Sequence, residues 1–227
     1  MTRKCIGIIS YFPKNLEHRK IRKERFNKLI QTLDIYFKLP IVIVAQNWDD
    51  EDIPISYNNK IIIYRYKNGL GITKARITLR EKLLSFNYDY YIFLDDDSDI
   101  VCTKEGVINY LAEIDNHPGM VGRFNSDWPR LLAISNQMLK IMDFDFIKDK
   151  EAYRGEIWED SAYLITYRRL YPNKFFIFSK RDIKEISPVA RKDTYSTWYR
   201  KEFGEEKQLR LNTKAIIEKW VRHKKGR

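Results

Sequence analysis

Short apolar runs alternate with longer amphipathic stretches through the first half of this chain. The runs are rich in isoleucine and valine, which favour buried strands, whereas the stretches between them repeat apolar residues at helical spacing. Because parallel strands need crossover connections, this alternation predicts an α/β fold with a mostly parallel central sheet and helices on both faces. The elements predicted in this half are strands at 5–10, 41–45, 60–66 and 90–94 and helices at 19–37, 72–86 and 104–115.

The second half of the chain has a less regular pattern. No repeat and no Pro/Gly-rich linker divides it from the first half, and 227 residues fit one large domain. We therefore expect a single domain over residues 1–227. The segments predicted in this half are strands at 120–124, 131–135 and 174–178, helices at 161–171 and 213–223, and a stretch of ambiguous type at 137–147.

The chain is strongly basic, with 42 Lys and Arg against 31 Asp and Glu and a formal net charge of +11. Such an excess favours a polyanionic partner, either nucleic acid or an anionic membrane surface. A bias in overall residue usage that leaves only a solvated basic surface is the alternative interpretation.

No apolar run approaches the roughly 18 residues that span a bilayer, and the chain starts directly on a strand-like run. We expect a cytoplasmic protein, in the host cytoplasm if it is virus-encoded, without integral membrane contact. Cys5 and Cys102 lack metal-ligand spacing, so we expect reduced structural thiols.

Three consecutive aspartates, Asp95, Asp96 and Asp97, follow the apolar strand predicted at 90–94. In an open parallel sheet the ligand crevice lies outside the carboxyl ends of the strands. Hard carboxylate ligands there suit Mg²⁺ or Mn²⁺ shared with substrate phosphates, and a cation would offset the mutual repulsion of the carboxylates. A simple polar turn is the alternative.

Three motifs of the chain together resemble those of glycosyltransferases with the GT-A fold, in particular family 2-like enzymes. The run from Tyr91 to Asp97 resembles their strand-end DxD motif. The loop at 68–71, followed by Ala75 and Arg76, is similar to the segment that faces the nucleotide diphosphate. Downstream, the run 158–160 leading to Arg168 resembles the ED motif.

The resemblance implies a GT-A-like, Rossmann-like domain with a nucleotide-sugar-binding half at 1–100 and an acceptor-binding half at 101–227. Asp97 would contact the metal most directly, Asp95 would face the metal and the ribose or donor sugar, and Asp96 would lie between them on the donor. Asp160 would be the general base that deprotonates the acceptor hydroxyl, and Glu159 would shape the acceptor pocket. Inversion at the anomeric carbon is then expected, whereas a helix cap is the alternative for the Glu-Asp pair.

Further donor contacts are expected around the predicted crevice. Lys74 and Arg76 are candidates for the diphosphate because a glycine-bearing loop and a helix start precede them. Asn68, Ser10 and Arg191 complete the predicted donor-binding set, with Arg191 on an irregular stretch that could close over the diphosphate. Ordinary exposed charges are the alternative for the basic members.

Some features depart from the family pattern. The chain has only three histidines and no histidine pair near its C-terminus, so a third protein ligand to the metal is not identified. The QxxRW motif of processive synthases is also absent, which favours single transfer to a soluble or surface-presented acceptor. The loop at 47–52 is expected either to border the nucleotide base or to be solvated.

The acceptor is predicted from the basic and aromatic second half of the chain. Basic groups interleaved with tryptophan and tyrosine suit a phosphate backbone with an extruded base. The leading prediction is therefore transfer from a nucleotide-sugar, with a UDP-sugar favoured, to a hydroxymethylated pyrimidine in double-stranded DNA. The alternatives are a cytoplasmic transferase acting on a glycan or lipid-linked sugar and, in another class, an inactive nucleic-acid-binding module or a nucleotidyltransferase. No obligate protein partner is predicted.

Overall fold

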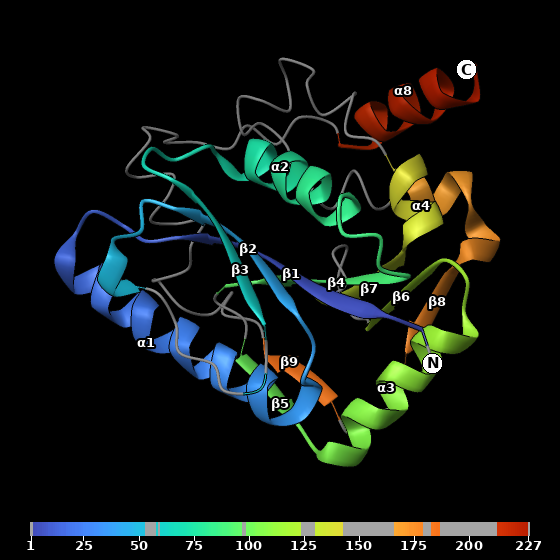
Figure 1. The fold of residues 1–227 in the computed structure, drawn as a ribbon. Coiled ribbons are helices and arrows are strands. Elements are labelled where there is room, and N and C mark those ends of the chain that lie inside the picture. Colours follow the sequence, from blue (N-terminus) through green and yellow to red (C-terminus); the bar gives the residue numbers. More distant parts are fainter. Residues whose placement is uncertain are drawn as a thin grey trace.

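The computed structural model describes most of the chain and all of the elements predicted in its first half. The described residues are 2–52, 58, 60–96, 99–123, 130–142, 166–178, 183–186 and 213–226. The helices are α1 (Leu16–Thr32), α2 (Ile72–Leu84), α3 (Lys104–Asn116), α4 (Asn136–Ile141) and α8 (Thr213–Lys225), with a π-helical turn at Leu33–Phe37 and 3-10 turns at Asp50–Asp52 and Pro172–Lys174 (Figure 1). The strands are β1 (Lys4–Tyr11), β2 (Ile41–Gln46), β3 (Ile61–Tyr66), β4 (Tyr90–Asp95), β5 (Asp99–Cys102), β6 (Met120–Arg123), β7 (Arg130–Ser135), β8 (Phe175–Phe178) and β9 (Ile183–Ile186).

A seven-stranded sheet in the order β3-β2-β1-β4-β7-β6-β8 forms the centre of the molecule. Strands β1 to β4 are mutually parallel, β7 is antiparallel to both of its neighbours, and β6 pairs in parallel with β8. The predicted α/β fold with a mostly parallel sheet is confirmed. The chain leaves β1 toward β2 and then returns to β4 on the other side of β1, so the strand order reverses there. Ligands of open α/β sheets bind at such a reversal, outside the carboxyl ends of the strands.

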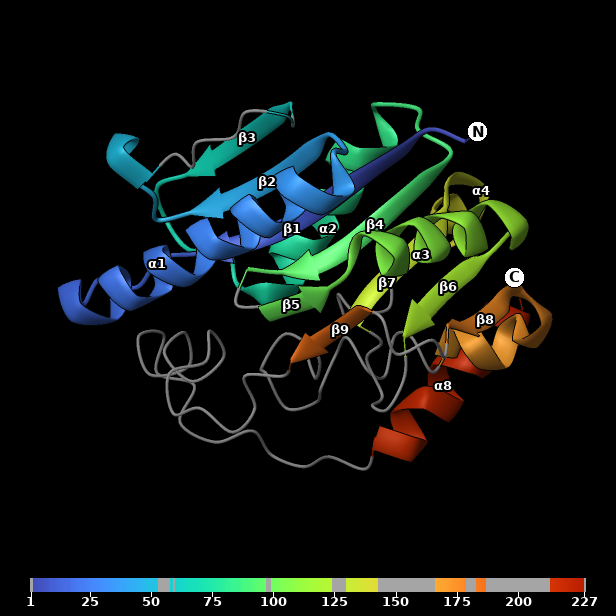
Figure 2. The same ribbon diagram turned by 90° about the horizontal axis from the view of Figure 1, so that it is seen from below.

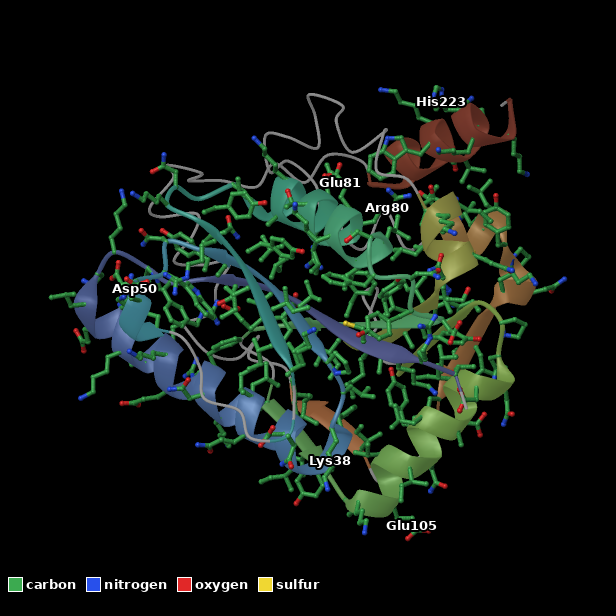
Figure 3. The ribbon with its side chains drawn as sticks, viewed as in Figure 1. Lys38, Asp50, Arg80, Glu81, Glu105 and His223 are labelled. Carbon is green, nitrogen blue, oxygen red and sulfur yellow. The ribbon has the colours of Figure 1, made fainter. Side chains whose placement is uncertain are left out.

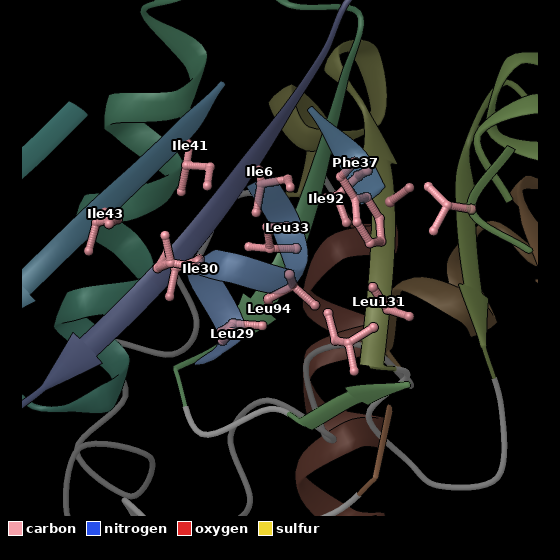
Figure 4. Packing of buried hydrophobic residues seen from close by; sticks show 14 of the residues in the cluster. Ile6, Leu29, Ile30, Leu33, Phe37, Ile41, Ile43, Ile92, Leu94 and Leu131 are labelled. Carbon is pink, nitrogen blue, oxygen red and sulfur yellow. The ribbon is translucent and has the colours of Figure 1, made fainter. Parts of the chain in front are cut away.

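Helices cover both faces of this sheet, as predicted. Helices α1 and α3 lie on one face, and α2, α4 and α8 lie on the other (Figures 1 and 2). Alternation along β1 divides its side chains between the faces, since Ile6 and Ile8 pack in the core on the α1 side while Cys5 and Ile9 pack on the α2 side. The first of these cores is packed from isoleucine, leucine and phenylalanine side chains (Figure 4).

Helix α2 approaches β1 closely at Gly7. A Cβ atom placed there would lie 2.7 Å from Leu83 Cδ1 and 3.3 Å from Leu79 Cδ2. A larger residue here would require the Leu83 side chain to shift, so glycine favours the close approach of α2 to the centre of this strand.

Most predicted boundaries agree with the structure to within a few residues. Helix α1 ends earlier than the predicted 19–37 helix, because the chain passes into the π-helical turn and then into the left-handed conformation at Lys38 (φ 53°). Thr103 caps α3 as expected, since its hydroxyl accepts a hydrogen bond from the Gly106 N–H at 2.9 Å. The ambiguous stretch at 137–147 is helical as far as Ile141, and residues 143–147 lie outside the described part.

The small antiparallel sheet of β5 and β9 was not predicted. Each of its strands has four residues, and Asp99 pairs with Ile186 while Cys102 pairs with Ile183. This sheet forms because two segments that are distant in the chain meet, and no local pattern in the sequence shows that they do.

Both cysteines are free thiols, as expected. Burial raises the pKa of the Cys5 thiol to about 12, which makes this side chain chemically inert at neutral pH. Among the residues described, we find no helix that combines the length and the apolar character needed to cross a bilayer.

Candidate active site

The carboxyl ends of β1 and β4 meet at the point where the strand order reverses. Asp95 is the last residue of β4 and pairs in register with Ile9 of β1. Its carboxylate lies 3.4 Å from the guanidinium of Arg76 on α2, with the Asp95 side chain 30% exposed and that of Arg76 11% exposed. The structure thus brings together two of the predicted donor-binding residues, at an edge open to solvent.

The start of α2 carries the other basic candidate of this region. Gly71 precedes the helix in a conformation with φ 83°, which glycine adopts without strain. Lys74 is exposed on the first turn, and Asn68 is exposed in the loop before it. The Leu70 N–H donates to the buried Gln46 Oε1 at 2.6 Å, so this loop is fixed to the end of β2.

The next aspartate, Asp96, points to the opposite face of the sheet. Its side chain is 2% exposed and lies 3.5 Å from the fully buried guanidinium of Arg22 on α1. The Ser10 hydroxyl donates to Asp96 Oδ2 at 2.7 Å, and the Tyr11 N–H donates to the same oxygen at 3.1 Å. Ser10 and Asp96, both predicted to bind the donor, are thus brought together as partners inside the protein. Their contact with a donor stays a prediction.

The direction of Asp96 follows from the alternation of β4. Leu94, two residues earlier, packs in the core on the α1 side, while Phe93 packs against the core on the α2 side. A residue two positions after Leu94 points the same way if the extended chain continues, so Asp96 turns toward α1 and Asp95 toward α2.

Arg22 is a site residue that our sequence analysis missed. It precedes Phe26 by four residues and Leu29 by seven, which places it on the buried stripe of α1. A cation on the apolar face of a helix requires a buried acidic partner. That signal is present in the sequence, in the spacing of Arg22 from the apolar residues of the same helix.

An aromatic cluster lies beneath this end of the sheet. The Phe12 and Trp48 rings stack with centroids 4.8 Å apart, and Phe26 meets Trp48 edge-on at 5.1 Å. The Trp48 indole N–H donates to the Ser10 hydroxyl at 3.2 Å. The loop after β2 is therefore joined to Asp96 through Ser10.

The loop after β2 is also held by ion pairs with α1. Arg19 pairs with Asp49 at 2.7 Å and with Asp52, and Lys23 lies 3.2 Å from Asp52. The Asn47 side-chain amide donates to the Phe12 carbonyl at 2.6 Å. Asp49 and Asp52 thus bind the protein's own cations. The expected place of the loop at 47–52 beside a nucleotide base stays a prediction.

Several predicted residues lie outside the described part of the chain. Asp97, Glu159, Asp160 and Arg191 belong to this group. Among the described residues, no three acidic, histidine or cysteine side chains cluster as a metal site. Asp95 nevertheless offers a partly exposed carboxylate, and Mg²⁺ is commonly held by one or two carboxylates together with substrate phosphates. The Asp95 carboxylate therefore fits a metal ion whose remaining ligands come from the substrate.

Basic side chains are exposed at a different place, on α8. Arg222, His223 and Lys225 are exposed in its last turn, while Trp220 packs into the core on the α2 side. His223 and Asp50, a residue of the loop after β2, lie at opposite sides of the molecule (Figure 3). The exposed basic surface of α8 is thus separate from the ion-paired cations of α1.

The sequence matches no protein-family profile, and no curated protein shows significant similarity to it. Solved structures with a similar fold exist. A candidate nucleotide-diphospho-sugar transferase from Desulfovibrio desulfuricans G20 aligns with a TM-score of 0.53 and 14% identity, over 99% of this chain and 99% of that protein.

Two further solved structures align at a similar level. Residues 1–349 of S. aureus TarS align with a TM-score of 0.55 and 16% identity, over 98% of this chain and 71% of that one. The glycosyltransferase GlyE of Streptococcus pneumoniae TIGR4 aligns with a TM-score of 0.54 and 13% identity, over 98% of this chain and 64% of that one. The chain therefore has the mixed α/β fold of nucleotide-diphospho-sugar transferases.

Proposed function

We propose that this protein is a glycosyltransferase that uses a nucleotide-sugar donor. The observation that carries the proposal is the pairing of Asp95 with Arg76 at the carboxyl ends of β1 and β4. This pair combines an oxygen ligand for a cation with a donor for phosphate oxygens, at the edge where open α/β sheets bind ligands. Structural neighbours described as sugar transferases support the same function.

The donor would be bound through its diphosphate. Asp95 and Asp97 would hold Mn²⁺ or Mg²⁺, which stabilises negative charge on the departing diphosphate. Arg76 and Lys74 would orient the phosphates, helped by the start of α2, whose free N–H groups favour anions. A UDP-sugar is the favoured donor. Residues 1–100 would form the nucleotide-sugar-binding half.

Transfer to the acceptor would depend on the second half, 101–227. Asp160 would remove the proton of the acceptor hydroxyl as that oxygen attacks the anomeric carbon from the side opposite the leaving diphosphate. Glu159 would shape the acceptor pocket. A single displacement of this kind inverts the anomeric configuration.

Release of a nucleoside diphosphate tests the donor half of the proposal. The protein would be incubated with UDP-, GDP-, ADP-, CDP- and TDP-sugars, with Mn²⁺ or with excess chelator. We expect nucleoside diphosphate from at least one donor, only with the cation, and less of it from Asp95→Asn. Pyrophosphate release from nucleoside triphosphates would instead identify a nucleotidyltransferase and contradict the proposal.

We further propose DNA with a hydroxymethylated pyrimidine as the acceptor. The net charge of +11 and the exposed basic turn of α8 support this choice. The cations of α1 contribute less than their number suggests, because Arg19, Arg22 and Lys23 pair with carboxylates of the protein. The exposed cations outside α1 would then carry most of the phosphate contacts.

Duplex DNA that contains hydroxymethylcytosine, compared with the same duplex containing cytosine, tests the acceptor. We expect radiolabelled sugar only in the hydroxymethylated duplex, and binding that weakens steeply with salt. Absence of salt-sensitive binding at low ionic strength would favour the alternative acceptor, a glycan or a lipid-linked sugar.

A further inference from the structure

We infer that Asp96 and Arg22 are positioning residues, which hold the end of β4 in the geometry that Asp95 needs for the metal and diphosphate. The inference rests on the proposed function. It gives Asp96 and Ser10 a role different from donor contact, and it adds Arg22 to the residues on which donor binding depends.

The first support is the connectivity of the Asp96 carboxylate. One oxygen accepts hydrogen bonds from the Ser10 hydroxyl at 2.7 Å and from the Tyr11 N–H at 3.1 Å. The other lies 3.5 Å from Arg22. The Asp96 side chain thus connects the end of β4 with the end of β1 and with α1. Trp48, in the loop after β2, joins this network by donating a hydrogen bond to Ser10.

The second support is the burial of the pair. The side chains of Arg22 and Asp96 are 0% and 2% exposed. Burying two charges costs hydration free energy, and the attraction between the charges offsets that cost only in part. A protein with an apolar pair of similar size in the same place is therefore commonly as stable. Stability alone therefore does not account for an ion pair here, whereas a fixed geometry beside a ligand site does.

The third support is adjacency along the chain. Asp96 directly follows Asp95, whose carboxylate is partly exposed and faces Arg76. Fixing the Asp96 carboxylate in three directions fixes the backbone that carries Asp95. Groups that orient a metal ligand in this way commonly change metal affinity by about 10- to 100-fold when they are removed.

A double variant can distinguish an effect on ligand affinity from an effect on the stability of the fold. Arg22→Met and Asp96→Leu would each be made alone, and then together. Affinity would be measured by calorimetry for Mn²⁺ together with whichever of UDP, GDP, ADP, CDP and TDP stabilises the wild type most. The Tm of each variant without ligand would be measured in parallel.

We expect both single variants to lose Tm, because each leaves a buried charge without its partner. The double variant should recover the part of the Tm that the unpaired charge costs, although the Ser10 hydroxyl and the Tyr11 N–H still lack their acceptor. It should nevertheless bind Mn²⁺ and nucleotide about tenfold more weakly than the wild type. Recovery of affinity together with Tm would overturn the inference and leave a purely structural pair. A wild type that binds none of the five nucleotides with Mn²⁺ would instead overturn the proposed function.

Asp34→Asn is the matched control. Asp34 is a buried carboxylate in the π-helical turn after α1, 6% exposed, and it accepts a hydrogen bond from the Asn58 N–H at 2.8 Å. We expect this variant to lose Tm without any change in nucleotide affinity. Weaker binding in proportion to the lost Tm would show that affinity only follows stability, which would also overturn the inference.

Ser10→Ala keeps the test decisive if the double variant does not fold. It removes the hydrogen bond to Asp96 and the acceptor of the Trp48 N–H, and it leaves the ion pair in place. We expect a folded protein whose affinity for Mn²⁺ with nucleotide falls about threefold, because Asp96 has lost one of its hydrogen bonds. Unchanged affinity would contradict the positioning role.

Discussion

Helices α1 and α2 lie on opposite faces of the sheet, and each directs one arginine at one of two consecutive aspartates. On the α1 side, Arg22 and Asp96 are 0% and 2% exposed. On the α2 side, Arg76 and Asp95 are 11% and 30% exposed. The same pairing of residue types therefore occurs in a dry environment on one face and in a solvated one on the other.

The difference teaches that one acidic run can serve two purposes. In a dry environment an ion pair is strong only while both members are present, and the loss of one member is costly. In a solvated environment each member keeps part of its hydration and can exchange its partner for a ligand. In the proposed function, Asp95 would bind the ligand and Asp96 would hold the site in place.

The largest expected effect comes from breaking the buried pair at one end. Arg22→Met leaves the Asp96 carboxylate buried beside an apolar side chain, so the free energy of unfolding should fall by about 3–5 kcal/mol. Urea unfolding monitored by circular dichroism would measure it. A loss smaller than about 1 kcal/mol would mean that the Arg22–Asp96 pair is not the more buried and more costly pair to break.

Next in size is the loss of the solvated carboxylate. Asp95→Asn removes a negative charge from the predicted metal site, so turnover of the nucleotide-sugar should fall by about 100-fold or more. The free energy of unfolding should change by less than about 1 kcal/mol, because the side chain is partly exposed. A variant with full activity would remove Asp95 from the site.

A smaller effect is expected for the arginine of the same pair. Arg76→Met should raise the donor KM about tenfold, which corresponds to about 1.4 kcal/mol of lost interaction with the diphosphate. Initial rates over a range of donor concentrations would separate KM from kcat. Lys82→Met, a change of another basic residue on α2 whose ammonium lies over the Tyr64 ring, serves as the control and should leave the KM unchanged.

The smallest effect concerns a third pair, Lys4 with Asp115, near the start of β1. Burial alone would raise the pKa of Asp115, but hydrogen bonds from Lys4 and Thr2 outweigh it and hold the pKa below its usual value. A lowered pKa stabilises the fold above the pKa of the unfolded chain, about 4, and this stabilisation disappears as the pH falls through the folded value.

Asp115→Asn should therefore be less stable than the wild type at neutral pH, and the difference should shrink in acid. Thermal unfolding at several pH values between about 3 and 7 would measure this trend. A difference that grows as the pH falls would have the wrong sign and would exclude the assigned pair.

The first half of the fold was predictable from sequence, because its strands and helices are long and strongly patterned. The run at 90–94 becomes β4, and Thr103 caps α3 as expected. The pairing of β5 with β9 was not predictable, since it joins segments far apart in the chain and no local pattern links them. The position of Asp95 at an open strand end was also predictable, because it follows directly from a strand that ends in carboxylates.

The partners of the strand-end aspartates were harder to predict. Arg22 was recognisable as a residue on the apolar stripe of α1, but its contact with Asp96 joins residues 74 positions apart in a way that no local pattern contains. The ion pairs of Arg19 with the loop at 47–52 were likewise not predictable, because the net charge of the chain does not show which charges pair with each other.

The sequence by itself determined which segments form strands and helices and where the acidic run lies along the chain, since these depend on periodicity and local chemistry. Only the tertiary structure decided which aspartate faces solvent and which is buried. That division depends on what packs on each face of the sheet, because a buried carboxylate can only hold the protein together, whereas a partly exposed one is accessible to a ligand.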